Sequence, residues 1–287
     1  MATPVSSPSA LLIEKIVRSA LEEDLGPQMQ DITSNLTVPA NRDIIAKICA
    51  REDGTLAGLI AGLSAFTIID PELEITLHVH EGDTISAGQT IATIEGNARS
   101  IMMAERVCLN ILGHLSGIAT LTARYVAAIA GTTATICDTR KTLPGLRALQ
   151  KYAVTCGGGN NHRFGLYDAI MIKDNHIAAS GGIEDALNNA SLLRSHTVKI
   201  EIEVDTLDQL QTVINHGGAD IVLLDNMNAQ QLTQAVNMIG DAPLISEASG
   251  GVSLETVAAI AQSGVNMISI GALTHSAPNF DFGLDIE

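Results

Sequence analysis

Six of the 16 Lys and Arg residues of this chain lie in one stretch, Asp138–His176, and this stretch offers the clearest means of doing chemistry. The whole chain is acidic, with 16 Lys and Arg against 32 Asp and Glu and a formal net charge of −16. Within the stretch only three acids accompany six basic residues, which are Arg140, Lys141, Arg147, Lys151, Arg163 and Lys173. A basic segment in an acidic protein is a local device, so we expect it to bind a small ligand that carries several negative charges.

The last third of the chain offers a complementary set of groups, because no Lys or Arg occurs after Lys199. The carboxylates of Glu203 and Asp225 suit Mg²⁺ or ribose hydroxyls on a phosphorylated sugar. Taken alone, each of these carboxylates could equally be a structural residue that forms an ion pair with a neighbouring lysine. Small residues in 249–251 and 271–275 follow apolar runs, and backbone N–H groups at a helix start hold phosphate without a basic side chain. We therefore expect a phosphate site in this part of the chain.

The sequence also excludes several kinds of site. It contains no P-loop, no HExxH and no GxSxG motif. The segment 156–162, CGGGNNH, has glycines but neither GxGxxG spacing nor a strand just before it, so it is a weak phosphate-loop candidate. Lys173 follows an apolar run, so it could alternatively be a catalytic lysine that forms a Schiff base with a carbonyl substrate. The net charge and an aromatic content of 2% argue against nucleic acid as the main partner.

The elements that must position these groups alternate in the second half of the chain. Six short apolar runs each end in polar residues, and they span 134–141, 169–176, 199–205, 220–226, 243–251 and 267–275. Helical patterns lie between them, at 183–196, 206–218, 229–239 and 253–264. This alternation predicts a parallel sheet, in which ligands bind at the carboxyl ends of the strands. A purely structural explanation is that each strand simply ends at a polar loop. Six strand ends with compatible chemistry make that explanation a poor one.

The first half has another pattern. An amphipathic helix is expected at 11–26, closed by Gly26, after a polar and frayed stretch 1–9. Alternation predicts antiparallel strands at 43–52, 54–60, 73–83 and 89–97. The segment 81–96 resembles the turn-rich strand pairs of lipoyl-like sandwiches but lacks a lysine at the turn, so we interpret it as scaffold.

A longer helix is expected at 101–130. Arg106, Asn110, Gly113 and Gly117 share one stripe of it at three- and four-residue spacing. Spacing alone leaves open whether Arg106 is a solvated surface charge.

The composition bounds the class of protein. At 287 residues, with 46% hydrophobic residues, the chain can bury a large core in one or two domains. The four cysteines, Cys49, Cys108, Cys137 and Cys156, have no metal-ligand spacing, so we expect reduced core residues of a cytoplasmic protein. Neither a secretory signal nor a membrane span is expected from the sequence.

Taken together, these segments resemble the quinolinate phosphoribosyltransferase family. The matching strings run in the family's order from Asp31 to Ser276, and the series DTRKT, KYAV, NHR and MIKDNH is long and specific. The resemblance implies an α/β fold with an N-terminal α/β sandwich and an incomplete, open α/β barrel of the type II phosphoribosyltransferase kind. It implies domains at 1–115 and 116–275, and a C-terminal tail, 276–287, that returns to the first domain. It also implies a homodimer, or a higher oligomer, whose active sites lie between the barrel of one subunit and the N-terminal domain of the other.

The family's reaction joins quinolinate to phosphoribosyl pyrophosphate in NAD biosynthesis, with Mg²⁺ required. The products are nicotinate mononucleotide, pyrophosphate and CO₂. Carried over by position, Arg106, Arg140, His162 and Arg163 clamp the two carboxylates, with Thr139 beside them. Lys141 and Lys173 would act where carboxylate and pyrophosphate meet, and Glu203 and Asp225 would serve the ribose hydroxyls and Mg²⁺, the metal indirectly. Ser249, Gly250, Gly271 and His275 would hold the 5′-phosphate, and Arg147 and Lys151 could equally be solvated helix residues.

Three alternatives stay open at this point. A nicotinate phosphoribosyltransferase without decarboxylation has a related barrel but handles one carboxylate, which fits a four-residue clamp less well. A non-catalytic paralogue would be expected to lose clamp residues, and none is lost here. A lysine-dependent aldolase would use Lys173.

Overall fold

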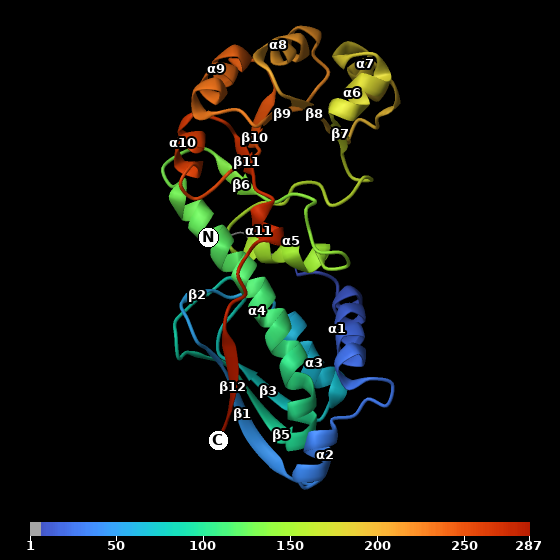
Figure 1. Cartoon of the computed structure of the whole chain (residues 1–287), viewed down its shortest axis with the longest axis vertical. Helices are drawn as coiled ribbons and strands as arrows, with labels where there is room; N and C mark the ends of the chain where they lie inside the picture. Colours follow the sequence, from blue (N-terminus) through green and yellow to red (C-terminus); the bar gives the residue numbers. More distant parts are fainter. Residues whose placement is uncertain (1–6) are drawn as a thin grey trace. The chain divides into compact units, whose positions relative to one another are not determined.

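Three of the antiparallel strands expected in the first half form one four-stranded sheet with the last strand of the chain in the computed structural model, which describes residues 7–287 (Figure 1). Its order is β12-β1-β5-β3, with β1 (Asp43–Ala50), β3 (Glu74–Leu77), β5 (Thr90–Asn97) and β12 (Phe282–Ile286). Every neighbouring pair is antiparallel, and Ile48 of β1 lies opposite Leu284 of β12. The last strand of the chain is therefore an edge strand of the first sheet.

The first helix, α1 (Ala10–Leu25), confirms the amphipathic pattern. Its buried residues Ile13, Val17, Leu21 and Leu25 recur at four-residue spacing, and Gly26 ends the helix with φ 68°. Fraying was expected over residues 1–9, of which 1–6 lie outside the described residues. The prediction was wrong at its end, because the Ser9 side chain accepts a hydrogen bond from Leu12 N and caps the helix.

The strand expected at 54–60 is wrong beyond its first two residues. Only β2 (Gly54–Thr55) is extended, and α3 (Leu59–Ile69) begins after Gly58, whose φ is 85°. Because α3 is apolar and buried on most sides, its sequence shows no clear helical stripe. The expected strand pair at 81–96 is also wrong, since β4 (Thr84–Ile85) pairs with β2 while β5 pairs with β1 and β3. A short helix, α2 (Ile32–Thr37), was not expected.

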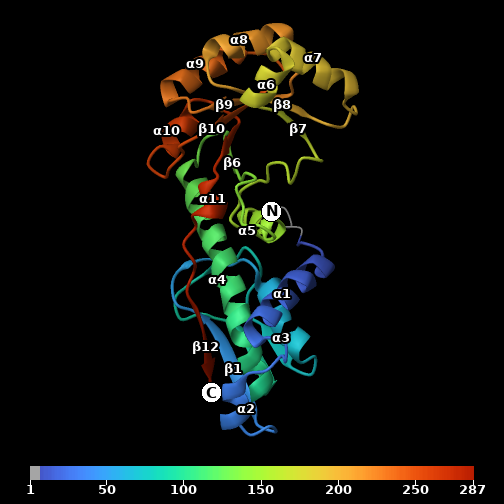
Figure 2. The ribbon, with the colours of Figure 1, turned by 45° about the vertical axis from the view of Figure 1, so that its right-hand side comes forward.

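The long helix is confirmed as α4 (Ala98–Ala128), but the small residues of its stripe have a packing role. A Cβ atom on Gly113 would lie 2.7 Å from Phe280 O, and one on Gly117 would lie 1.9 Å from Pro278 O. Phe280 N donates to Gly113 O at 2.9 Å. The chain before β12 thus runs directly against the helix backbone (Figure 2). Glycine is needed there so that two backbones can approach each other.

Gly117→Ala is accordingly expected to destabilise the protein by about 1–3 kcal/mol, because the new methyl group overlaps the Pro278 carbonyl. In a helix without such a neighbour the same change would stabilise by about 1 kcal/mol. Thermal unfolding and amide hydrogen exchange in Phe282–Ile286 would measure the effect, with Asn110→Ala on the exposed part of α4 as control. A higher melting temperature for Gly117→Ala would contradict this packing.

Six parallel strands form the second sheet, and all six predicted apolar runs are confirmed as strands. They are β6 (Thr135–Cys137), β7 (Ile170–Ile172), β8 (Ile200–Val204), β9 (Ile221–Asp225), β10 (Ile245–Ser249) and β11 (Met267–Ser269). Their order is β6-β11-β10-β9-β8-β7, so the strands at the two edges, β6 and β7, do not pair with each other. The barrel is therefore open, as the fold class requires.

Helices connect these strands. The expected ones are α7 (Ile183–Leu193), α8 (Leu207–His216), α9 (Ala229–Ile239) and α10 (Val257–Gln262). The short helix α6 (Asp174–Ser180) was not expected, whereas α11 (Ala272–His275) begins directly after Gly271, where the small residues predicted that a strand enters a helix. The helices α7 to α10 follow one another along one side of the sheet (Figure 1).

By contacts, the chain forms two units. The first contains residues up to Ala123 together with Thr142–Gly158 and Leu273–Glu287, and the second contains Arg124–Lys141 and Gly159–Ala272. The basic stretch is thus divided between them. All four cysteines are free and buried, as expected. Among the described residues no helix is long and apolar enough to cross a membrane.

The middle of the basic stretch forms α5 (Arg147–Cys156) in the first unit. Lys151 was weighed as a solvated residue, but it is 0% exposed, so that interpretation is wrong. The segment 156–162 was a weak phosphate-loop candidate, and its Gly157 instead packs on α4. A Cβ atom there would lie 2.4 Å from Ala119 O. Residues 156–158 thus belong to the first unit, whereas 159–162 belong to the second.

Candidate active site

The parallel register brings most of the predicted site residues to one edge of the second sheet. Adjacent strands align Glu203 with Leu223 and Ser249 with Asp225, so their carboxyl ends are level. The residues that lie at or after these ends are Thr139, Arg140, Lys141, Lys173, Glu203, Asp225, Ser249, Gly250 and Gly271. His162 and Arg163 lie in the segment before β7, just after Asn160, which forms a bridge with Cys137 of β6. The other two, Arg106 on α4 and His275 at the end of α11, belong to the first unit, where both are exposed.

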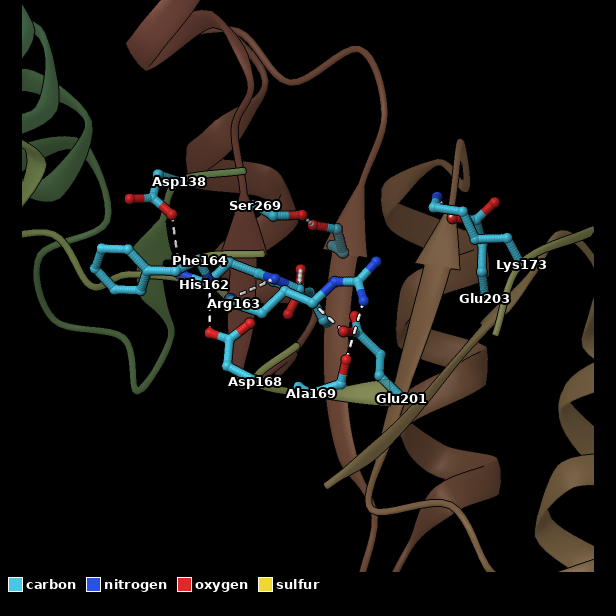
Figure 3. A network of polar contacts seen from close by, with 12 residues as sticks. Asp138, His162, Arg163, Phe164, Asp168, Ala169, Lys173, Glu201, Glu203 and Ser269 are labelled. Carbon is cyan, nitrogen blue, oxygen red and sulfur yellow. Dashed lines mark hydrogen bonds and ion pairs between the residues drawn. The ribbon is translucent and has the colours of Figure 1, made fainter. Parts of the chain in front are cut away.

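Lys173, Glu203 and Asp225 lie at the ends of β7, β8 and β9, and Lys141, which follows β6, acts on Asp225 through its charge. Lys173 Nζ donates to Glu203 Oε2, and the Glu203 side chain is 14% exposed (Figure 3). Burial and the charge of Asp205 raise the pKa of Asp225, while the charges of Lys173 and Lys141 oppose that rise. Lys173 therefore forms an ion pair with Glu203. This is the pairing with a neighbouring lysine that the sequence analysis gave as the structural alternative for Glu203.

The ends of β10 and β11 carry the small residues. Gly250 has φ +92°, and a Cβ atom on it would lie 2.2 Å from Asn226 Oδ1, so this position requires glycine. Asn226 N donates to Ser249 O at 2.9 Å and ties the end of β9 to that of β10. The expectation that 249–251 opens a helix is wrong, because α10 begins only at Val257. A turn, and not a helix N-terminus, therefore presents these backbone groups.

Four successive backbone N–H groups, those of residues 162–165, donate hydrogen bonds that hold the segment that carries Arg163. Figure 3 shows the side chains of Asp138, His162 and Asp168 in this segment. His162 N donates to Asp138 Oδ1 at 2.9 Å, and Arg163 N donates to His162 Nδ1 at 2.8 Å. Phe164 N and Gly165 N donate to the two oxygens of Asp168, at 2.6 and 2.9 Å. Since side chains of this sheet and loop accept all four, the loop has a defined conformation.

Arg140 and Arg163 are the two arginines of this loop region. The pKa of Arg163 is lowered, first by burial and then by the nearby charge of Arg140, whereas Glu201 and Asp168 act in the opposite direction. Arg163 Nη1 donates to Ala169 O at 3.0 Å. The Nε atoms of Arg140 and Arg163 are buried and have no hydrogen-bond partner among the described residues. A carboxylate is the group that satisfies such donors.

Two functional candidates, Glu201 and Glu247, were missed by the sequence analysis. They lie inside the sheet beside His162, whose Nε2 is 3.0 Å from Glu201 Oε2 and 3.5 Å from Glu247 Oε1. Both glutamates are almost fully buried. Burial, and then the charge of Glu201, raise the pKa of Glu247 to about 7. The only available signal was that each lies two residues before a predicted site residue, Glu203 or Ser249, and so shares its face of the strand.

The raised pKa of Glu247 predicts a pH dependence of stability. The folded protein keeps a proton on this group between its ordinary pKa of 4.5 and about 7, where the unfolded chain has lost it. The free energy of unfolding should therefore decrease as pH rises through this window, with the contribution present below 4.5 and lost above about 7. In Glu247→Gln this decrease should be absent.

Melting temperatures of both proteins at about pH 5 and about pH 8 would measure the difference, which we expect to be a few degrees, since ~1 kcal/mol corresponds to about 2–4 °C in a chain of this size. Glu184→Gln, at an exposed site on α7, serves as the control. Identical pH profiles for the wild type and Glu247→Gln would contradict the assignment.

Comparison with known proteins places this geometry in a family. Two family models match the chain: quinolinate phosphoribosyl transferase, N-terminal domain, over residues 31–116, and the C-terminal domain of the same family over residues 118–285. The nicotinate-nucleotide pyrophosphorylase [carboxylating] of Mycobacterium leprae (strain TN) is 43% identical over 277 residues, which are 94% of this chain and 95% of that protein. A probable nicotinate-nucleotide pyrophosphorylase [carboxylating] of Bacillus subtilis (strain 168) is 41% identical over 276 residues, 96% of this chain and 94% of that protein.

The solved structure of the nicotinate-nucleotide pyrophosphorylase from Francisella tularensis has the same fold. It is 37% identical, and the superposition has a TM-score of 0.93 and covers 100% of both chains. The residues matched by the two family models include all of the predicted site residues.

Proposed function

The chain belongs to the quinolinate phosphoribosyltransferase family, and we propose that it is the pentosyltransferase that makes nicotinate mononucleotide. It joins quinolinate to phosphoribosyl pyrophosphate and releases pyrophosphate and CO₂, a step of de novo NAD biosynthesis. The observation that carries this proposal for the site is the pair of buried, unpartnered Nε–H groups of Arg140 and Arg163. Two adjacent guanidinium groups match a planar ring with two neighbouring carboxylates.

The chemistry requires positioning more than covalent catalysis. The pyridine nitrogen attacks the anomeric carbon while pyrophosphate leaves, and the transition state carries positive charge on the ribose ring. Arg140 and Arg163 would fix the two carboxylates, with Thr139 beside them, so that the nitrogen faces the ribose. Lys141 and Lys173 would offset charge where a carboxylate meets the pyrophosphate. After the transfer, the positively charged ring nitrogen accepts the electron pair released when the 2-carboxylate leaves as CO₂.

The ribose phosphate would lie over the acidic and small-residue strand ends. Glu203 and Asp225 would bind ribose hydroxyls, and Ser249, Gly250, Gly271 and His275 would hold the 5′-phosphate. Turn and backbone N–H groups suit this role because no Lys or Arg follows Lys199 in the sequence.

Mg²⁺ fits these residues as a metal held chiefly by the substrate. When bound, it would neutralise charge on the pyrophosphate. Glu203 and Asp225 supply the hard oxygen ligands that Mg²⁺ prefers. Among the described residues, however, neither Glu203 nor Asp225 belongs to a cluster of three side chains that could together bind a metal ion. Substrate oxygens and water would therefore complete the coordination.

The assembly proposed with this function is a cytoplasmic homodimer, with domains at 1–115 and 116–275 and the tail 276–287. In it, Arg106 of one subunit would serve the site of the other. The exposure of Arg106 on α4 supports this role. The small residues Gly113 and Gly117 on its stripe do not, because they pack against the chain before β12.

A substrate-omission experiment tests the function. Purified protein is incubated with quinolinate labelled at the 2-carboxylate, phosphoribosyl pyrophosphate and Mg²⁺, and labelled CO₂ and nicotinate mononucleotide are measured. Both should form together and only when all three components are present. Lack of product from folded protein, or faster turnover of nicotinate than of quinolinate, would overturn the proposal.

A further inference from the structure

The buried group formed by His162, Glu201 and Glu247 lies next to Arg163 and is not explained by substrate binding. Glu201 is 2% and Glu247 is 1% exposed, so neither carboxylate faces a ligand directly. One oxygen of each, Oε1, is buried without a hydrogen-bond partner among the described residues. Burying two carboxylates beside one imidazole is costly, and such a cost is typical of a functional site.

The hydrogen bonds of His162 determine how its ring is used. Its Nδ1 accepts from the backbone N–H of Arg163 at 2.8 Å. The proton of the neutral ring must therefore lie on Nε2, which points at Glu201 Oε2, 3.0 Å away, and Glu247 Oε1, 3.5 Å away. Both ring nitrogens are thus engaged by the protein. A metal ion at Nε2 would have to displace this proton, so the geometry favours hydrogen bonding over metal binding.

The ring joins the sheet interior to the backbone that carries Arg163. On one side the ring meets Glu201 of β8 (Figure 3) and Glu247 of β10. On the other side it accepts a hydrogen bond from the backbone N–H of Arg163. The charge of Glu201 also acts on the Arg163 guanidinium and offsets the repulsion from Arg140. If the ring lost its partners on the sheet, the N–H of Arg163 would lose a fixed acceptor.

We propose that Glu201 and Glu247 are positioning residues, which hold His162 in one orientation and through it hold Arg163 where it meets a quinolinate carboxylate. The inference rests on the proposed function of the arginine pair. It changes the role expected for His162, which then supports the clamp from behind and does not itself grip a carboxylate.

The first test separates the two substrates. Glu201→Met, which keeps the volume but removes the acceptor, should raise the KM for quinolinate at least tenfold and leave the KM for phosphoribosyl pyrophosphate within twofold. Glu201→Gln, whose amide oxygen still accepts from Nε2–H, should restore the KM for quinolinate to within threefold of the wild type. Equal changes in both KM values, or a normal KM for quinolinate in a folded Glu201→Met protein, would overturn the proposal.

A matched control comes from the first unit. Glu81 is also mostly buried and accepts from Gly58 N at 2.8 Å and Ile60 N at 3.2 Å. Glu81→Met should lower thermal stability without changing the ratio of the two KM values. If it changes that ratio as Glu201→Met does, the effect is general destabilisation and the proposal fails.

The second test needs no substrate and so stands apart from the proposed function. Amide hydrogen exchange of residues 162–168 should be faster in Glu201→Met than in the wild type, and normal in Glu201→Gln. Unchanged exchange in Glu201→Met would overturn the positioning role even in an active enzyme. A wild type that fails to use quinolinate, but shows the expected exchange pattern, would overturn the function and leave the positioning of Arg163 supported.

Discussion

Replacing Arg163 with alanine is expected to weaken quinolinate binding by about a hundredfold, or about 3 kcal/mol, and to change phosphoribosyl pyrophosphate binding by about threefold at most. The guanidinium is partly buried and its Nε–H has no acceptor among the described residues, so a bound carboxylate would lose a bidentate partner in a place that water reaches poorly. Separate titrations of the two ligands by calorimetry would measure both affinities.

Two further variants make this result specific. Arg163→Lys keeps the charge but not the fork of donors, so it should recover only part of the quinolinate affinity. Arg124→Ala, which removes an exposed arginine of the same unit, should alter neither affinity. An equal loss for both ligands in Arg163→Ala would count against a carboxylate-binding role.

Glu203→Ala is expected to have the opposite selectivity. The carboxylate holds Lys173 at the strand ends near Asp225, so its loss would disturb the cations and acids that would meet the ribose and pyrophosphate. We expect kcat/KM for phosphoribosyl pyrophosphate to fall by about a hundredfold to a thousandfold, a loss comparable to that of one transition-state hydrogen bond. Quinolinate affinity should stay within about threefold.

Steady-state kinetics with each substrate varied in turn, together with direct quinolinate binding, would measure this. Glu184→Ala on the exposed face of α7 is the matched control and should behave as the wild type. Loss of quinolinate binding in Glu203→Ala, with an unchanged KM for phosphoribosyl pyrophosphate, would contradict the assignment of Glu203 to the ribose and pyrophosphate part of the site.

The six strands of the open barrel were predictable because each is a short apolar run with a polar end, and that pattern needs no knowledge of neighbours. For the same reason most candidate residues from Arg140 to Gly271 were found, since they lie at or after one of these ends. His162 and Arg163 lie before β7 and were found from the basic stretch and the family's motif. Helix α3 was not found, because a helix that is apolar on most sides has no period that separates it from a buried strand.

The sequence by itself therefore determined the parallel sheet, the separation of cationic and acidic strand ends, and the resemblance to one family of transferases. Only the tertiary structure decided that Glu201 and Glu247 meet His162 inside the sheet, that Lys151 is buried, and that Gly117 packs against the chain before β12. Periodicity is a local property of the chain, whereas the burial of a polar side chain depends on which distant segments cover it. The environment of the basic residues is accordingly set by the fold.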